Sequence, residues 1–323
     1  MKLADAIRER FAIWALRSRP PEPSPVVLGY RRIYVLPTRD GMAFGASLVL
    51  MLLGAINYNL SLGYALVFLL AGLGITTIFH SFRNLLAVSL VPGKAAPVFV
   101  GEIAHFGLVL HNPDREPRRL LTLSLRNGTA ETLDIPAAMS AEVRLGLPAS
   151  RRGWLALPRI TLETTYPLGL IRAWAYAAPE MYCLVYPEPA TDAPPPPHAS
   201  GTAGGRLQRS PTGDDFSGLR SHQPADPPRH VAWKAAARQD GTAPLLTKQF
   251  SGASAETLWL DWSATDIGIP TERRLSILTR WVLDAAQSGT SWGLRLPSET
   301  LPPDTGTAHL QASLKALALH DAA

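Results

Sequence analysis

The chain has 323 residues, too many for one small module, and this length predicts two or three compact units. Its net charge of +5 is mildly basic, but many arginines precede the first long apolar stretch, which points to a membrane surface rather than to nucleic acid. The single cysteine, Cys183, excludes an internal disulfide framework and a multi-cysteine zinc site. It lies in an apolar run of strand character, so we expect a buried thiol and not a nucleophile.

The N-terminal segment has helical amphipathic character. Leu3, Ile7, Phe11 and Trp14 fall on one face of a helix, and basic residues occupy much of the remaining surface. Two alternatives stay open: the helix lies in the membrane interface against anionic lipids, or it packs on a domain of its own chain. We assign residues 1–40 to a cytoplasmic amphipathic segment.

A long apolar stretch follows. The 39 residues from Gly41 to Phe79 contain no charged side chain, whereas one membrane span needs only about 20 residues. The polar stretch Asn57–Ser61 divides the run, so residues 41–80 are predicted to form a two-helix transmembrane hairpin. The alternative is a buried hairpin of a soluble core. Basic residues flank both ends of the run, which predicts that both termini are cytoplasmic. The glycines expected at the helix–helix contact are Gly54, Gly63, Gly72 and Gly74.

The periodicity changes after the hairpin. Residues 85–190 contain short runs, several alternating apolar and polar positions, separated by turn signals. This spacing predicts an antiparallel sandwich of the immunoglobulin-like kind. Residues 191–212 are rich in proline, glycine and serine and are predicted to be a linker.

An unusually charged stretch runs from Gly213 to Gln239. Asp214, Asp215 and Arg220 precede a helix-start pattern at Asp226. Three interpretations compete: a catalytic centre, a docking surface and a structural polar corner. Buried charges must be paired in any case, so we expect the carboxylates to accept hydrogen bonds from loop amides or from the arginines.

The last part of the chain alternates strands and helices. An apolar run ends at Asp261, and the pattern Asp261-x-Ser263-x-Thr265 resembles the metal-ion-dependent adhesion motif of von Willebrand factor A domains, which holds a divalent cation such as Mg²⁺. Only about seventy residues of this alternation are present, which leaves few places for further ligands. We therefore expect no tight cation binding, and expect Asp261 to cap local backbone. The Gly-x-Ser-x-Gly match at 289–293 lies between a predicted helix and a strand, the reverse of the order that serine hydrolases need.

Taken together, the charged stretch, the hairpin before it and the strand "LWLDWS" after it resemble the domain-of-unknown-function 58 family of bacterial membrane proteins. The matching positions are Gly213, Asp214, Asp215, Phe216, Gly218, Leu219 and Arg220, then Asp226, Arg229, Val231, Trp233, Lys234 and Arg238. Asp215 stands where the family usually has Glu, and Ala225 where a glycine is expected. The resemblance covers residues 40–323. It implies a partial von Willebrand A-like region over residues 213–323, and association with MoxR-type AAA+ ATPases and transglutaminase-like membrane proteins.

The expected fold is therefore an α+β membrane protein with a transmembrane hairpin, an immunoglobulin-like β-sandwich and a truncated von Willebrand A-like α/β unit. The favoured function is a membrane-anchored adaptor or scaffold in the bacterial inner membrane, whose cytoplasmic domains engage a MoxR-type ATPase or its client. No catalytic residue is predicted. The alternative is a metal-dependent ligand-binding protein, or an enzyme that uses Asp214, Asp215 and Arg220. Nucleic-acid binding is not expected, because the basic N-terminal residues flank a membrane span.

Overall fold

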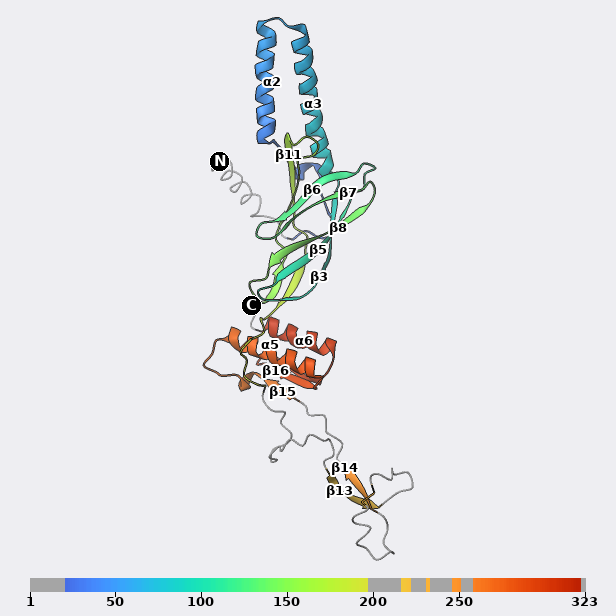
Figure 1. The fold of residues 1–323 in the computed structure, drawn as a ribbon, viewed down its shortest axis with the longest axis vertical. Helices are drawn as coiled ribbons and strands as arrows, with labels where there is room; N and C mark the ends of the chain where they lie inside the picture. Colours follow the sequence, from blue (N-terminus) through green and yellow to red (C-terminus); the bar gives the residue numbers. More distant parts are fainter. Residues whose placement is uncertain (1–20, 197–215, 222–230, 233–245, 251–257, 321–323) are drawn as a thin grey trace, which may run out of the picture. The chain divides into compact units, whose positions relative to one another are not determined.

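The computed structural model describes residues 21–196, 216–221, 231–232, 246–250 and 258–320 (Figure 1). The chain combines two apolar helices with several β-sheets, which confirms a mixed α+β class. It divides between Glu188 and Pro189 into two compact units. The N-terminal unit contains the hairpin and a β-rich body, and the C-terminal unit contains an α/β layer.

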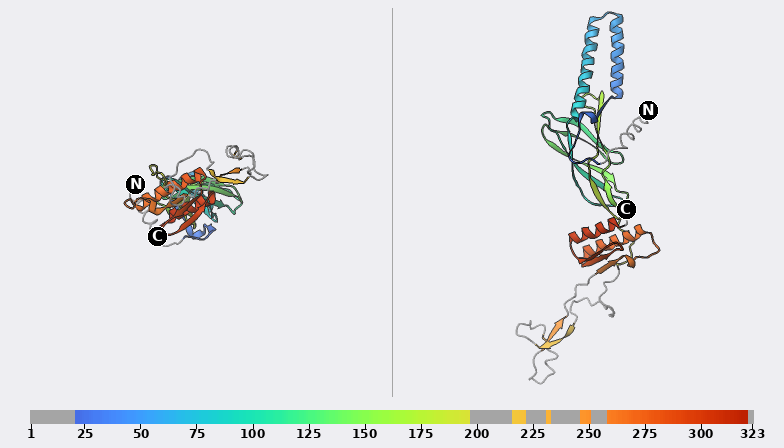
Figure 2. Two further views of the ribbon diagram at one scale, coloured as in Figure 1. Left: turned by 90° about the horizontal axis from the view of Figure 1, so that it is seen from below. Right: turned by 180° about the vertical axis from the view of Figure 1, so that it is seen from behind.

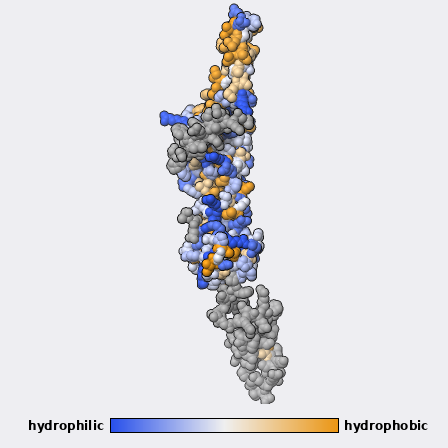
Figure 3. Space-filling model, turned by 90° about the vertical axis from the view of Figure 1, so that its left-hand side faces the viewer, coloured by the Kyte–Doolittle hydropathy of each residue, from blue (hydrophilic) through white to orange (hydrophobic). Residues whose placement is uncertain are grey.

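The predicted hairpin consists of helices α2 (Arg39–Asn57) and α3 (Ser61–Leu85), which lie side by side in Figures 1 and 2. Both are long and apolar enough to cross a membrane. Only 6% of the apolar window of α2 and 11% of that of α3 is buried, so the hairpin is not the core of a soluble unit formed by the described residues. Figure 3 shows much of its surface as hydrophobic.

Two of the four glycines expected between the helices lie at their contact. A Cβ atom at Gly63 would lie 3.0 Å from the Cβ of Ala55, and one at Gly74 would lie 3.5 Å from the ring of Phe44. Gly54 and Gly72 have open space where a side chain would be. Spacing along the sequence cannot distinguish these pairs, because the rotation of each helix about its axis decides which glycine faces the partner.

The inner end of α3 is anchored in the β-rich body by polar side chains. Ser81 is fully buried, and its hydroxyl donates to the carbonyl of Tyr166 at 2.7 Å. Asn84 Nδ2 donates to the carbonyl of Arg119 at 2.7 Å and to Thr164 Oγ1 at 2.9 Å, and Asn84 Oδ1 accepts from the Arg119 amide at 3.0 Å. The helix therefore continues without interruption from its exposed apolar part into the protein interior.

The start of α2 is fixed to the same body. Thr38 Oγ1 caps the helix by accepting from the Gly41 amide at 3.0 Å, and it donates to the carbonyl of Gly169 at 2.7 Å. The Thr38 amide donates to the carbonyl of Leu170 at 2.9 Å. A Cβ atom at Gly41 would lie only 1.9 Å from that Leu170 oxygen, so glycine is the residue that allows this approach.

The β-rich body contains three sheets. One is ordered β1-β3-β5-β8, the second β2-β11-β10-β6-β7 and the third β4-β12-β9. All described pairs in them are antiparallel except β4 with β12. The strands are β1 (Val26–Val27), β2 (Ile33–Pro37), β3 (Ser89–Ala95), β4 (Val98–Phe99), β5 (Ile103–His111), β6 (Arg118–Leu125), β7 (Ala130–Ile135), β8 (Ser140–Pro148), β9 (Gly153–Ala156), β10 (Ile160–Thr164), β11 (Ile171–Ala177) and β12 (Tyr182–Tyr186).

One hydrophobic core joins these sheets. Phe106 and Leu108 of β5 pack in the same cluster as Leu123 of β6 and Leu162 of β10, all essentially inaccessible to solvent. Alternation along β5 places every second residue in this core, as the period of two predicts. Cys183 belongs to the cluster and is fully buried, which confirms the expected buried thiol, and burial raises its pKa.

Two boundaries differ from those expected. Residues 21–37, assigned from the sequence to the amphipathic segment, contribute β1, the 3-10 helix η1 (Tyr30–Arg32) and β2 to the β-rich body. Residues 1–20 lie outside the described residues. The sequence also presents residues 153–165 as one strand-like run, but they form two strands in different sheets, β9 and β10, separated by residues 157–159.

The C-terminal unit contains a three-stranded sheet ordered β15-β16-β17, in which β15 and β16 are parallel and β17 is antiparallel to β16. Its elements are β15 (Leu258–Asp261), η3 (Trp262–Ala264), α5 (Thr271–Ser288), β16 (Trp292–Arg295), β17 (Thr300–Asp304) and α6 (Thr307–Leu319). The predicted apolar face of α5 is confirmed, since Leu275, Leu278, Trp281, Val282 and Ala285 are all buried. Ser291, the serine of the Gly-x-Ser-x-Gly match, lies between α5 and β16 as predicted. The nucleophile of a serine hydrolase instead lies on a turn from a strand into a helix.

Ala190 and the first residues of the predicted linker contact α5. The Ala190 amide donates to the carbonyl of Ser276 at 3.0 Å, and Trp281 Nε1 donates to the carbonyl of Pro194 at 2.7 Å. Arg273 pairs with Asp192 and, chiefly through its hydrogen bond, lowers the pKa of that carboxyl. The described part of this proline-rich stretch therefore packs on α5 and belongs to the C-terminal unit.

Candidate functional site

The charged signature lies mostly outside the described residues. Phe216, Gly218, Leu219 and Arg220 belong to strand β13 (Phe216–Ser221), which pairs antiparallel with β14 (Leu246–Phe250). The signature positions outside the described residues are Gly213, Asp214, Asp215, Asp226, Arg229, Trp233, Lys234 and Arg238. Val231, between them, is buried and forms an isolated bridge with Thr247. The polar-corner hypothesis for this stretch therefore stays a prediction.

The second candidate, the Asp-x-Ser-x-Thr pattern, lies at the carboxyl end of β15. Asp261 is the cap of η3: its Oδ1 accepts from the Ser263 amide at 2.8 Å and from the Ser263 hydroxyl at 2.7 Å. This confirms the predicted capping role. Asp261 Oδ2 lies 3.7 Å from Nη1 of Arg295.

Thr265 is engaged differently. Its hydroxyl donates to the carbonyl of Trp262 at 2.6 Å and accepts from Nε of Arg274 at 2.7 Å. Arg274 also donates through Nη2 to the same carbonyl at 2.7 Å, and its guanidinium lies 3.9 Å from the centroid of the Trp262 ring. Two guanidinium groups therefore contact two of the three side chains of the motif, Arg295 with Asp261 and Arg274 with Thr265.

This arrangement has a clear electrostatic character. The hydrogen bond from the Ser263 hydroxyl is the main cause that lowers the pKa of Asp261, and Arg295 acts in the same direction. The ionised carboxylate is thus already neutralised by a neighbouring cation. A divalent cation would have to compete with Arg295 for Asp261 and tolerate Arg274 beside Thr265. Within the described ranges, no three His, Cys, Asp or Glu side chains gather where they could hold a metal ion.

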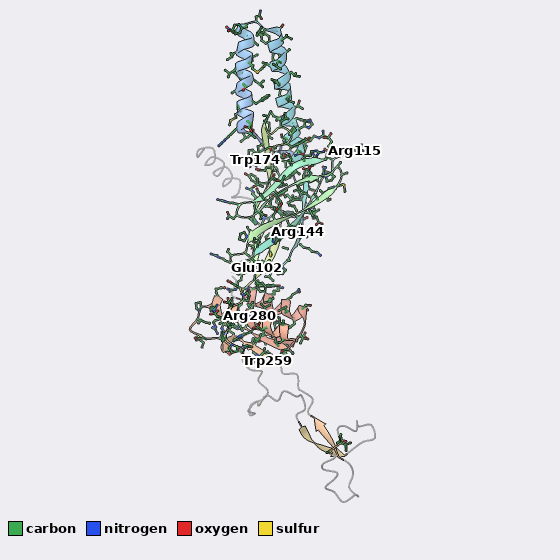
Figure 4. All side chains as sticks on the ribbon, viewed as in Figure 1. Glu102, Arg115, Arg144, Trp174, Trp259 and Arg280 are labelled. Atoms are coloured by element: carbon green, nitrogen blue, oxygen red, sulfur yellow. The ribbon has the colours of Figure 1, made fainter. Side chains whose placement is uncertain are left out.

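One face of this sheet carries an aromatic and charged surface. The ring of Trp259 lies over Gly293, where a Cβ atom would be 2.6 Å from the ring, and the guanidinium of Arg295 lies 3.9 Å from the centroid of the same ring. Trp259, Asp261 and Arg295, which we call the strand-end surface, alternate with the buried Leu260 and Leu294 along β15 and β16. Figure 4 labels Trp259 at this sheet and Arg280 on the helical layer.

The strand-end surface is partly open to solvent. The side chain of Arg295 is 49% exposed and that of Asp261 is 32% exposed. Tryptophan and arginine are among the residue types most enriched at the energetically dominant positions of protein–protein interfaces. Chemically, the surface can bind a partner through apolar stacking and through one cation and one anion held in fixed positions.

Sequence reasoning identified Asp261, Ser263 and Thr265 but missed Trp259, Arg274 and Arg295. A signal for two of them was present, because "LWLD" and "GLRL" both alternate, and parallel pairing of these strands brings the intervening residues to one face. Arg274 carries no comparable signal: its contact with Thr265 depends on where the loop 262–270 places the start of α5.

The chain was compared with known proteins. No protein-family model matches it, and a search of curated proteins finds no match.

Proposed function

We propose that this protein is a membrane-anchored adaptor or scaffold of the bacterial inner membrane, with both termini in the cytoplasm. The observation that carries the proposal is the construction of α3. Its outer part exposes large apolar side chains such as Leu62 and Phe68, at 84% and 65% exposure, while its inner end buries the polar Ser81 and Asn84 in the β-rich body. Such a helix suits lipid at one end and a folded domain at the other.

The attachment of the hairpin to the β-rich body also supports the proposal. Both ends of the hairpin are held to the β-rich body, α2 through Thr38 and α3 through Ser81 and Asn84. The body would therefore stand at a defined height and orientation relative to the bilayer. A scaffold requires such positioning, whereas a flexible tether would only confine the domain to the membrane.

The finer fold assignments belong to this proposal. We infer that the β-rich body is an immunoglobulin-like sandwich, because two antiparallel sheets share one core. The parallel pair β15–β16, with α5 between its strands in the chain, supports a truncated von Willebrand A-like unit. The strand-end surface on this unit is the docking surface that we propose for a protein partner.

The identity of the partner comes from the resemblance. It implies a MoxR-type AAA+ ATPase or its client, and a transglutaminase-like membrane protein, as the molecules bound. The test is capture of partners by the tagged full-length chain from detergent-solubilised membranes, followed by mass spectrometry. Trp259→Ala with Arg295→Ala should abolish capture of the ATPase, while Arg280→Ala, which removes an equally exposed arginine from α5, should leave it intact. Equal capture by both variants would contradict a role for the strand-end surface.

Orientation needs a separate experiment. Alkaline phosphatase is active only outside the cytoplasm, so fusion after Pro187 should give no activity. Fusion in the turn between Asn57 and Ser61 should give an active enzyme, since the uncharged turn crosses the membrane while the arginine-rich flanks do not. The opposite pattern would overturn the orientation and with it the cytoplasmic partner.

A further inference from the structure

A hollow of about 390 Å³ opens beside the inner end of α3. Its walls include three aromatic side chains, from Tyr30 of η1 and from Phe79 and Phe82 of α3. The remaining wall includes three charged groups, Arg83 of α3, Asp114 of the loop before β6 and Arg118 at the start of β6. We call this hollow the hairpin-base pocket. All of its walls belong to the N-terminal unit.

The position of the pocket along α3 is informative, given the proposed membrane hairpin on which this inference rests. From Ser61 to Phe79 the helix rises about 27 Å, close to the roughly 30 Å thickness of the hydrocarbon layer. Phe79 ends the uncharged run, and Arg83 follows one helical turn later. The pocket would therefore lie at the level of the lipid headgroups, with its aromatic wall nearer to the acyl chains.

Arg118 frames the pocket. Only 4% of its side chain is exposed, and its guanidinium donates to Asn112 Oδ1 at 3.1 Å, to the carbonyl of Leu86 at 3.1 Å and to the carbonyl of Arg83. Its Nη2 also donates to Asp114 Oδ2 at 3.2 Å. Because its guanidinium already makes these hydrogen bonds, Arg118 holds the loop 112–118 against α3. We therefore assign ligand binding to the neighbouring side chains.

Arg83 has the properties of a ligand-binding group. Its side chain is 34% exposed, and its Nη2 and Nη1 lie 3.3 Å from Asp114 Oδ2 and 3.3 Å from Glu116 Oε1. A guanidinium has five N–H donors, so these two contacts leave donors for a phosphodiester. Two carboxylates supply negative charge next to that cation. Asp114 lines the pocket, and its pKa is lowered chiefly by a hydrogen bond from the Arg115 amide, while Glu116, 56% exposed, lies beside the pocket through its ion pair with Arg83.

We propose that the hairpin-base pocket binds a membrane phospholipid that carries a primary amine in its headgroup, such as phosphatidylethanolamine. The phosphodiester accepts from Arg83, and the ammonium group donates to the carboxylates of Asp114 and Glu116. The glycerol and upper acyl chains contact Tyr30, Phe79 and Phe82. The alternating charges of the pocket match such a zwitterion better than an anionic headgroup, which would place hydroxyl groups or a second negative charge against Glu116.

The test is native mass spectrometry of the full-length chain in detergent, titrated with phosphatidylethanolamine or with phosphatidylglycerol. The wild-type chain should bind one phosphatidylethanolamine in preference to phosphatidylglycerol. Arg83→Ala should weaken this binding by roughly tenfold, the loss typical of one charge-assisted hydrogen bond. Glu116→Gln should reduce phosphatidylethanolamine binding and should not weaken phosphatidylglycerol binding, because the charge of Glu116 disfavours the anionic headgroup. Tyr30→Ser should weaken the binding of both lipids.

Arg144→Ala is the matched control, because Arg144 is an exposed arginine of β8, in the same unit but away from the hairpin (Figure 4). Slow labelling of the buried Cys183 by maleimide verifies that each variant is folded. If Arg83→Ala is not folded, Tyr30→Ser carries the test, since Tyr30 is 72% exposed. The proposal is overturned if Tyr30→Ser and folded Arg83→Ala bind as the wild type does, if phosphatidylglycerol is preferred, or if Arg144→Ala is equally weakened. Failure of the membrane proposal would instead appear in the alkaline phosphatase fusions.

Discussion

The hairpin exposes large apolar side chains of the kind that the β-rich body buries. Phe68 of α3 is 65% exposed, whereas Phe106 of β5 is fully buried. The hairpin exposes its leucines and phenylalanines around the helices, while its buried polar residues cluster at its inner end. The comparison teaches that apolar content alone does not decide burial. In β5 the buried residues alternate with outward positions that include His105 and His111, whereas the outer part of α3 has no buried face.

Both environments occur within α3, whose outer part exposes apolar side chains and whose inner end buries polar ones. Thr77, Ser81 and Asn84 are almost completely buried, although they follow directly on exposed residues such as Ile75. Each buried polar group has a hydrogen-bond partner, in its own helix for Thr77 and in the β-rich body for the other two. Three pairs of substitutions test this division, each comparing a residue packed in or against the β-rich body with one on the exposed part of the hairpin.

The largest difference is expected between the two phenylalanines. Phe106→Ala should destabilise the β-rich body by about 3–5 kcal/mol, because it leaves a cavity in a closed core. Phe68→Ala should change stability by less than about 1 kcal/mol, since the side chain faces the surroundings of the hairpin. The rate at which maleimide labels Cys183 in increasing urea measures opening of this body, because Cys183 belongs to its core. Similar labelling of both variants would contradict the proposed division.

The next effect concerns two glycines of α2. Gly41→Ala should cost about 1–3 kcal/mol or more, because the new Cβ would overlap the Leu170 carbonyl and force the backbone apart. Gly45→Ala meets no atom within 4 Å and should leave stability unchanged or slightly raised. Thermal unfolding of the full-length chain in detergent measures both. A Gly41→Ala midpoint equal to that of Gly45→Ala would show that the base of the hairpin is loosely attached.

A comparable pair tests the polar anchor of α3. Asn84→Ala removes three hydrogen bonds and leaves the amide and carbonyl of Arg119 without these partners, which should cost about 1–3 kcal/mol. Thr76→Ala is the control, because the exposed Thr76 hydroxyl donates to the carbonyl of Gly72 in its own helix and not to the described part of the β-rich body. Cys183 labelling should accelerate in the first variant and stay unchanged in the second. Equal rates would mean that Asn84 contributes nothing to the attachment.

The smallest effect is expected at Asp261 and depends on pH. Its folded pKa is lowered, so its contribution to stability is present above the unfolded pKa of about 3.9 and is lost as the pH falls through the lower folded value. Because the carboxylate is 32% exposed, this contribution should be below about 1 kcal/mol. Asp261→Asn should therefore be less stable than the wild type at pH 6, and the gap should close near pH 2. A gap that stays constant over this range would contradict a stabilising ionised Asp261.

Local pattern was sufficient for several elements. The uncharged run predicts the hairpin, because 39 residues without a charged side chain have no face suited to water and are long enough to cross a membrane twice. The apolar face of α5, with Leu275 and Trp281, follows from a period of 3.6 residues, and the cap at Asp261 follows from a short polar side chain at a strand end. These features depend on residues within one or two turns of each other, and such neighbours are visible in the sequence.

Only the tertiary structure decided how distant segments combine. Residues 21–37 join the β-rich body because β2 pairs with β11, some 135 positions later. The same holds for the candidate sites. Arg118 frames the hairpin-base pocket, and Arg295 stacks on Trp259, only because strand pairing and loop paths bring these residues together. Each such contact requires closing a long loop, which costs conformational entropy. Burial of apolar surface across the whole unit offsets this cost, and a local sequence pattern contains no information about that burial.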